Sequence, residues 1–263
     1  MIFGLAPLFG RNIRPRGQAV LTSSTSWTVP AGVKSVSIAC IGAGGSWGSS
    51  GDGGGGGGAW SSTNDISVTP GESLTFESGS LFRVLRGGDV LVAAESGRAN
   101  DGTPEGTGQG GAASNGVGDV RRSGGNGGTG GRGGGGGAAS YFGDGGDGGN
   151  DGDNPGQAGN MSAGGGATRS GFISGGGGGV DAKLLDTPNG RGGIVNSGTA
   201  KDRGGGGFGG GENGAQEGAT GSTSSGGNYG GGQGSNGSQE PGMGAARIIW
   251  GEGRKYPDNS GDV

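Results

Sequence analysis

The sequence predicts a mainly β protein, a jelly-roll-like β-sandwich into which a long bundle of polyglycine helices of the polyproline-II type is inserted, with little or no α-helix. Three observations predict this fold class. Glycine accounts for 81 of the 263 residues. This share is several times the about 7% that is usual in ordinary chains. Apolar and polar residues alternate at the two-residue period of strands on both sides of the glycine-rich region. No stretch combines a convincing 3.6-residue period with helix caps.

Strand patterns with turn signals between them run through residues 18–100. Ile66 and Val68 alternate with serine and threonine, and a Pro-Gly turn signal follows. Apolar runs on both sides of residues 86–89, Arg-Gly-Gly-Asp, predict a hairpin. We expect Cys40 to be a small buried hydrophobic residue. The tryptophans expected to belong to the sandwich are Trp27, Trp60 and Trp250.

Residues 101–244 are rich in glycine, and a strand pattern returns at residues 245–250, Ala-Ala-Arg-Ile-Ile-Trp. Low hydrophobicity with high glycine is typical of disorder, which composition alone leaves as an alternative. The closing apolar strand favours order, because a β-sandwich needs its last strand whereas a flexible linker does not. A shorter glycine insertion covers residues 42–58. Collagen is excluded, since the glycines occur in runs such as 53–58 and keep no strict period of three along the chain.

Ordered glycine of this kind has definite structural requirements. A polyproline-II helix rises about 3.1 Å per residue, with three residues per turn and no internal hydrogen bonds. Its amides and carbonyls must therefore bond to neighbouring helices. Glycine is needed wherever one helix faces another, so we expect side chains only on outer faces and at turns. Such a bundle has no conventional hydrophobic core.

Changes in composition divide the chain into four parts. We predict an attachment segment at 1–17, a sandwich made of 18–100 with 245–251, a glycine bundle at 101–244 and a C-terminal tail at 252–263. The first part is apolar and basic but has neither the basic n-region nor the cleavage site of a signal peptide. Two interpretations of this segment stay equally open. In one it docks on a larger assembly, and in the other it packs as a strand on its own domain. The candidate attachment residues are Ile2, Phe3, Leu5, Leu8 and Phe9.

Several function classes are excluded or disfavoured by what the sequence lacks. The chain has no histidine and one cysteine, so Ser-His-Asp catalysis, Cys-His catalysis and zinc sites cannot be built from it alone. The formal net charge of −4 opposes binding to nucleic acid. No Gly-Lys pair is present to form a phosphate-binding Walker loop, and no run of 18 apolar residues predicts membrane insertion. We therefore predict no enzyme activity and no cofactor.

The few bulky side chains of the glycine-rich region are candidates for contact with a partner. Exposed aromatic residues on loops commonly carry binding energy. The alternative is that each of them packs over a glycine helix or a neighbouring loop. The candidate receptor contacts, of which Tyr141-Phe142 and the run 169–173 are the best candidates for loop tips, are Tyr141, Phe142, Arg169, Phe172, Ile173, Phe208 and Tyr229.

An acidic cluster in the same region is a weak candidate for calcium binding, because loops rich in oxygen atoms can hold that ion. Neither the calcium-binding nonapeptide repeat nor the EF-hand pattern is completed. A solvated acidic turn is the favoured interpretation, and no metal is predicted. The residues of the cluster are Asp144, Asp147, Asp151 and Asp153.

Three sequence signatures, in the expected order, resemble a glycine-rich module of bacteriophage virion and tail-fibre proteins. Residues 27–36, Trp-Thr-Val-Pro-Ala-Gly-Val-Lys-Ser-Val, resemble its opening. Residues 66–74, with Val-Thr-Pro-Gly, resemble its second signature, and residues 247–251 resemble its closing strand. The module is similar to the β-sandwich with inserted glycine helices in receptors of the anaplastic lymphoma kinase type. The layout is also similar to the polyglycine tail-fibre-tip adhesins of T-even-type phages.

The resemblance implies a phage receptor-binding protein at the tip of a tail fibre or spike. Loops between the glycine helices would then bind a bacterial surface receptor, either an outer-membrane protein or a glycan, and other virion tail proteins would be the remaining partners. The expected location is the virion, after synthesis in the host cytoplasm without a signal peptide. Two alternatives stay open. One is a non-receptor virion structural protein, such as a decoration, baseplate or fibre-joint component. The other is an ice-binding or surface-binding glycine bundle, although regular threonine rows are lacking.

Overall fold

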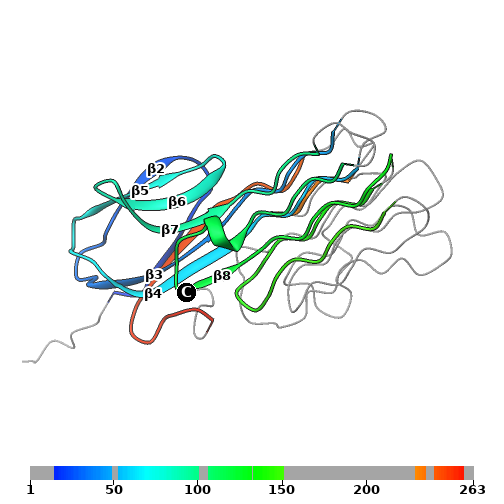
Figure 1. Cartoon of the computed structure of the whole chain (residues 1–263). Helices are drawn as coiled ribbons and strands as arrows, with labels where there is room; N and C mark the ends of the chain where they lie inside the picture. Colours follow the sequence, from blue (N-terminus) through cyan, green and yellow to red (C-terminus); the bar gives the residue numbers. More distant parts are fainter. Residues whose placement is uncertain are drawn as a thin grey trace, which may run out of the picture.

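A computed structural model describes six stretches of the chain, which are mainly β. In these stretches the chain forms two antiparallel sheets and one short 3-10 helix, η1 (Ala113–Asn115) (Figure 1). The prediction of a mainly β chain with almost no helix is confirmed at this level. Nothing helical in the described stretches has the length and apolar character that crossing a membrane requires. The described residues are 15–48, 53–100, 106–131, 133–150, 229–234 and 240–257.

The larger sheet contains the predicted C-terminal strand in its interior. Its strands, in spatial order, are β1 (Gly17–Leu21), β9 (Ala245–Trp250), β3 (Ser35–Ile41), β4 (Trp60–Ser67) and β8 (Val120–Arg122). All neighbouring strands are antiparallel. Ile248 on β9 lies opposite Ala19 on one side and Ile38 on the other. Strand β8 falls inside the range 101–244 that the sequence assigned to the glycine bundle, so that boundary is corrected: this range also supplies a strand to the sheet.

The smaller sheet contains the predicted hairpin. Its strands, in spatial order, are β2 (Thr25–Thr28), β5 (Ser73–Glu77), β6 (Leu81–Arg86) and β7 (Asp89–Glu95). Gly87 and Gly88 join β6 to β7 with φ angles of 56° and 109°, in the region that glycine adopts without steric cost. Gly71 in the turn before β5 has a φ of 84°. The turn signals of the sequence therefore correspond to real turns.

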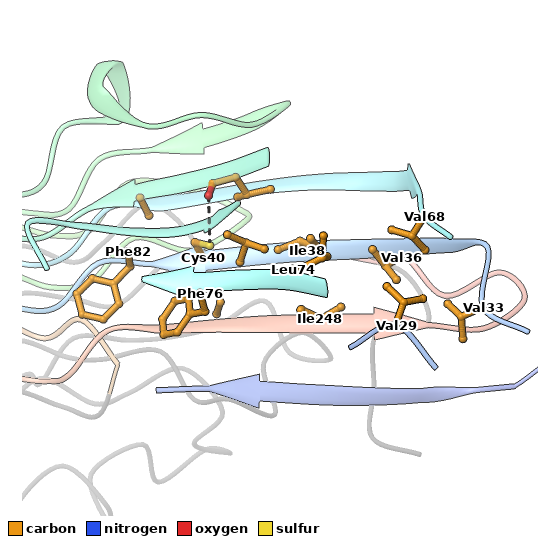
Figure 2. Close-up of a cluster of buried hydrophobic side chains, with 14 residues drawn as sticks. Val29, Val33, Val36, Ile38, Cys40, Val68, Leu74, Phe76, Phe82 and Ile248 are labelled. Atoms are coloured by element: carbon orange, nitrogen blue, oxygen red, sulfur yellow. Dashed lines mark hydrogen bonds between the residues drawn. The ribbon is translucent and has the colours of Figure 1, made fainter. Parts of the chain in front are cut away.

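Side chains from both sheets meet in one hydrophobic cluster. Figure 2 shows Ile38 of β3, Phe76 of β5 and Ile248 of β9 within it, and each of these side chains is fully buried. Cys40 is also buried in the cluster, as predicted, and its Sγ lies 3.8 Å from the carbonyl oxygen of Val92. Burial raises the pKa of the Cys40 thiol, since the charged thiolate is not solvated there. This cluster joins the two sheets.

A second hydrophobic cluster covers the opposite face of the larger sheet. Ile41, Trp60 and Ile249 pack there against Tyr256, which follows β9 and is fully buried. The side chain of Asn64 exchanges two hydrogen bonds with the backbone of Tyr256, at 2.7 Å and 2.8 Å. The described part of the predicted C-terminal tail, residues 252–257, therefore packs against the larger sheet through Tyr256.

Extended glycine-rich stretches, here called the glycine segments, continue from the ends of several strands. In Figure 1 they run side by side away from the two sheets. Their ends next to the strands are called the sheet end, and their opposite ends the far end. The glycine segments are residues 42–48, 53–59, 96–100, 106–112, 123–130, 133–140, 143–150, 229–234 and 240–244.

Candidate binding surface

The segment 53–59, here called the central segment, donates its amides to three neighbouring segments in rotation. Every third amide bonds to the same neighbour, with N to O distances of 2.7–3.1 Å. A rotation of this kind is the geometry of a helix with three residues per turn. The donor and acceptor pairs, in order, are Gly54 to Gly128, Gly55 to Gln233, Gly56 to Arg98, Gly57 to Gly125, Gly58 to Gly230 and Ala59 to Glu95.

The carbonyl groups of the central segment follow the same rotation toward three other neighbours. Their N to O distances are 2.7–3.0 Å. The central segment is therefore bonded to six other stretches of chain, and all of its residues are buried. The acceptor and donor pairs, in order, are Gly54 with Gly108, Gly55 with Gly136, Gly56 with Gly45, Gly57 with Gly111, Gly58 with Ala139 and Ala59 with Gly42.

Contact on all sides explains why the central segment is an unbroken run of glycine. A Cβ atom added to Gly57 would overlap the backbone carbonyl of Gly137, and one added to Gly56 would overlap that of Gln109. Backbone atoms in this position are held by hydrogen bonds of their own and cannot move aside as a flexible side chain can. Every residue from Gly53 to Gly58 meets a neighbouring carbonyl in this way.

Two other segments, here called the edge segments, carry a side chain at every third residue. Residues 123–130 read Ser-Gly-Gly-Asn-Gly-Gly-Thr-Gly, and residues 143–150 read Gly-Asp-Gly-Gly-Asp-Gly-Gly-Asn. The glycines between the side chains face neighbouring backbone, as at Gly125 and Gly148. The glycines therefore keep a period of three locally, in the edge segments, although they keep no strict period of three along the whole chain.

The acidic side chains of the second edge segment bond to the first. Asp144 accepts the amide of Ser123, and Asp147 accepts the amide of Asn126, both at 2.7 Å. Asn150 continues the row and accepts the amide of Thr129 at 2.9 Å. Within the described stretches no three Asp, Glu, Cys or His side chains gather as metal ligands would. The other two calcium candidates, Asp151 and Asp153, lie outside the described residues.

Three of the predicted contact residues lie at the sheet end. Tyr141 and Phe142 form the turn between segments 133–140 and 143–150, with ring centroids 5.6 Å apart. Tyr229 begins another segment with a φ of 56°. All three are half-buried and pack against the second hydrophobic cluster. The structure therefore does not place Tyr141 and Phe142 at a far-end tip, because their turn adjoins the start of β4.

The remaining predicted contact and attachment residues lie outside the part of the chain that the structure describes. The contact candidates in that position are Arg169, Phe172, Ile173 and Phe208. The attachment candidates in that position are Ile2, Phe3, Leu5, Leu8 and Phe9.

A small cavity lies beside Tyr229 on the outer face of the larger sheet. Its volume is about 20 Å³, roughly the room that one water molecule needs. Trp60, Tyr256 and Arg247 contribute to its mainly apolar lining. The cavity is too small to hold an organic ligand.

The far end carries an aromatic residue that the sequence analysis did not select. Trp47 is half-buried in segment 42–48, and its amide donates to Oε1 of Gln233 at 3.3 Å. The preceding residue, Ser46, accepts the amide of Asn100 at 3.3 Å. A usable signal was present in the sequence, because Trp47 alone among the four tryptophans stands inside a glycine insertion.

The described surface thus has two ends with different chemistry. Aromatic side chains at the sheet end pack against the second hydrophobic cluster, whereas Trp47 at the far end belongs to neither cluster of the described residues. No protein-family model and no curated protein matches this chain. The arrangement of the glycine segments is therefore the feature of the described residues that bears on function.

Proposed function

We propose that this chain is a bacteriophage virion protein that binds a receptor on the bacterial surface, at the tip of a tail fibre or spike. The observation that carries the proposal is the central segment, which is hydrogen-bonded to six surrounding stretches of chain. So many bonds hold the glycine segments in fixed positions relative to the sheets. A scaffold of this kind presents the far end of the segments as a rigid surface for contact.

The fold proposed for this function is a jelly-roll-like β-sandwich with an inserted bundle of polyproline-II helices. The shared hydrophobic cluster of the two sheets supports the sandwich. The three-residue rotation of hydrogen bonds supports polyproline-II geometry in the central segment. Far-ultraviolet circular dichroism tests this fold: we expect a β signal and a polyproline-II signal that are lost together in one cooperative transition. Gradual loss of the polyproline-II signal alone would contradict it.

The proposed mechanism is reversible binding without chemical change. A rigid scaffold reduces the conformational entropy lost on binding, and many copies on one particle strengthen weak individual contacts. The receptor is a bacterial outer-membrane protein or glycan, and other tail proteins are the partners in the virion. We further propose that the apolar residues near the N-terminus attach the chain to the particle.

Binding to susceptible bacteria tests the proposed function. The purified protein should bind cells that the phage infects and should block infection when added in excess. Resistant cells that lack the receptor serve as the control and should bind no protein. Absence of cell binding, together with stoichiometric co-purification with internal tail or capsid parts, would instead support a non-receptor structural role in the virion.

A further inference from the structure

We propose that Asn115 is a site of spontaneous deamidation, and that its modification loosens the junction between the smaller sheet and the glycine segments. This inference does not depend on the receptor-binding function. Three observations carry it: an Asn-Gly pair in an exposed turn, a glycine that packing requires at position 116, and an amide side chain that holds the carboxylate of Glu95.

An asparagine followed by glycine carries the reacting groups of deamidation in its own chain. The backbone nitrogen of Gly116 attacks Cγ of the Asn115 side chain and forms a C–N bond. The side-chain nitrogen leaves as ammonia, taking the proton of the Gly116 amide. Water then opens the cyclic imide and leaves an aspartyl or iso-aspartyl residue. Glycine favours the attack, because no Cβ shields its nitrogen.

Packing requires glycine after Asn115. Gly116 is buried, and an added Cβ would lie 2.5 Å from the hydroxyl oxygen of Ser61 and 2.9 Å from the carbonyl oxygen of Ala93. The next residue, Val117, pairs with Ala93 through two backbone hydrogen bonds of 2.9 Å. A larger residue at position 116, which would slow the reaction, therefore does not fit this turn.

A second Asn-Gly pair, Asn126-Gly127, is held by several glycine segments. The Gly127 amide donates to Gly108 at 2.8 Å. The Asn126 side chain accepts the amide of Gly110 at 3.0 Å, and its own amide donates to Asp147 at 2.7 Å. This pair can react only when segments of the bundle separate. The remaining Asn-Gly pairs of the sequence lie outside the described residues, at 189–190, 213–214 and 236–237.

The backbone amides of Asn115-Gly116 bond within their own turn instead. The Asn115 amide donates to Ala112 at 3.2 Å, and the Gly116 amide donates to Ala113 at 3.1 Å. The Asn115 side chain donates to Oε2 of Glu95 at 2.9 Å. Both asparagines are exposed, so hydrogen bonding rather than burial separates the two pairs. Opening one short turn needs less free energy than separating segments of the bundle, and we therefore expect the turn to react first.

Deamidation replaces the amide that Glu95 binds by a second carboxylate. The new group has no N–H to donate, and its charge repels the Glu95 carboxylate. Arg98, which donates to Oε1 of Glu95, and Arg121, beside the same turn, offset only part of this repulsion. An iso-aspartyl product also adds a carbon atom to the main chain of the turn. Because the Glu95 carboxylate accepts the Ala112 amide, the modification loosens the end of segment 106–112.

Peptide mapping by mass spectrometry of the purified full chain, kept at mildly alkaline pH, tests the site. Cleavage after Arg121 and Arg122 places the two asparagines in separate peptides. We expect Asn115 to lose ammonia at least about tenfold faster than Asn126 in the folded chain. In denaturant the two rates should become similar, because glycine follows both residues. Equal rates in the folded chain, or an unchanged difference in denaturant, would overturn the proposal.

The consequence of the modification is tested with Asn115→Asp. This variant should melt about 2–4 °C below the unmodified chain at neutral pH and should exchange the amide hydrogens of residues 106–112 faster. In a Glu95→Gln background the same substitution should cost much less, because the facing charge is gone. A variant as stable as the unmodified chain, or an equal cost in both backgrounds, would show that deamidation does not loosen the junction. The rate comparison needs no variant and decides the site even if Asn115→Asp fails to fold.

Discussion

The two sheets and the glycine segments belong to one chain but are held together by different interactions. Between the sheets, side chains such as Ile38, Phe76 and Ile248 are removed from water, and each stabilises the fold by about 1.5–3 kcal/mol. The central segment has no side chain larger than the methyl group of Ala59. Its residues bond instead through both backbone groups, and each such bond contributes about 0.5–1.5 kcal/mol net.

The difference shows what decides whether a glycine-rich stretch is ordered. Glycine loses more conformational entropy on folding than any other residue, so isolated glycine runs stay flexible. The central segment offsets this cost because each of residues 54–59 both donates and accepts a hydrogen bond with a neighbouring stretch. The same close approach makes the glycine segments intolerant of side chains, whereas the cluster between the sheets requires them.

The largest expected effect is that of a single methyl group in the central segment. Gly57→Ala would place a Cβ against the carbonyl of Gly137, with backbone on every side and no flexible side chain to move. We expect the free energy of unfolding to fall by about 5 kcal/mol or more, an exceptionally large loss for one substitution. Denaturant-induced unfolding, followed by circular dichroism, measures the loss.

A matched substitution in the sheets separates steric overlap from the general effect of replacing glycine. Gly79 lies in the turn before β6, where an added Cβ meets no atom within 4 Å. Gly79→Ala should change the free energy of unfolding by no more than about 0.5 kcal/mol. Equal effects of the two substitutions would show that the central segment is not tightly packed.

A truncation between the sheets should cost somewhat less and should reveal whether the two regions unfold together. Phe76→Ala empties part of the first hydrophobic cluster and should cost about 3–5 kcal/mol. Because the strands continue into the glycine segments, we expect amide hydrogen exchange to accelerate in residues 54–59 as well as in β3 and β9. Val117→Ala, at an exposed position, is the control. Acceleration confined to the strands would mean that the two regions are separate cooperative units.

The strands could be predicted from the sequence because their side chains record which face is buried. The alternation around Ile66 and Leu74 and the Arg-Gly-Gly-Asp turn correspond to strands and a turn in the structure. Strand β8 could not be predicted, because its three residues, Val120–Arg122, are too short to show a period. The buried position of Tyr256 also escaped prediction, since it depends on Asn64, which is 192 positions away in the sequence.

The candidate site was harder to predict, because its residues differ in neighbours rather than in type. Tyr141 and Trp47 are both aromatic residues beside glycine runs, yet only Tyr141 lies next to a hydrophobic cluster. Which end of a segment a residue occupies depends on the pairing of segments, and glycine carries no side-chain pattern that records this pairing. The edge segments are the exception, because the side chain at every third residue marks the positions that no neighbouring backbone crowds.

A smaller effect is expected at an edge segment, where side chains replace backbone as hydrogen-bond acceptors. Asp147→Ala removes the acceptor of the Asn126 amide and should lower the free energy of unfolding by about 1 kcal/mol. Asp147→Asn keeps an acceptor oxygen and should cost much less. Thermal unfolding of both variants in the presence and absence of calcium checks this. A large stabilisation by calcium that both substitutions abolish would show that the carboxylate binds metal rather than the neighbouring segment.

The smallest effect concerns Glu95, where the smaller sheet passes into the glycine segments. Partial burial raises the pKa of Glu95, but hydrogen bonds from the Ala112 amide, Asn115 and Arg98 outweigh it and hold the pKa below its ordinary value of 4.5. A carboxyl group whose pKa is lowered by folding stabilises the native state above that ordinary value, and the contribution is lost as the pH falls below it. The effect is modest, because Arg98 is largely exposed and solvent screens its charge.

Melting temperatures measured at decreasing pH can show that the stabilisation by ionised Glu95 acts at the junction between the smaller sheet and the glycine segments. Glu72 in the smaller sheet also has a lowered pKa, chiefly because it accepts the Thr69 amide. Glu95→Gln should therefore flatten only part of the fall in melting temperature below pH 4.5, with Glu72→Gln removing a separate part. The two substitutions differ in where they act, because the Glu95 carboxylate accepts the amide of Ala112 in the glycine segment 106–112, whereas the Glu72 carboxylate accepts the amide of Thr69. At acidic pH we expect residues 106–112 to exchange amide hydrogens faster when Glu95, but not Glu72, is protonated. Identical exchange patterns in the two variants would mean that Glu95 does not couple the sheet to the glycine segments.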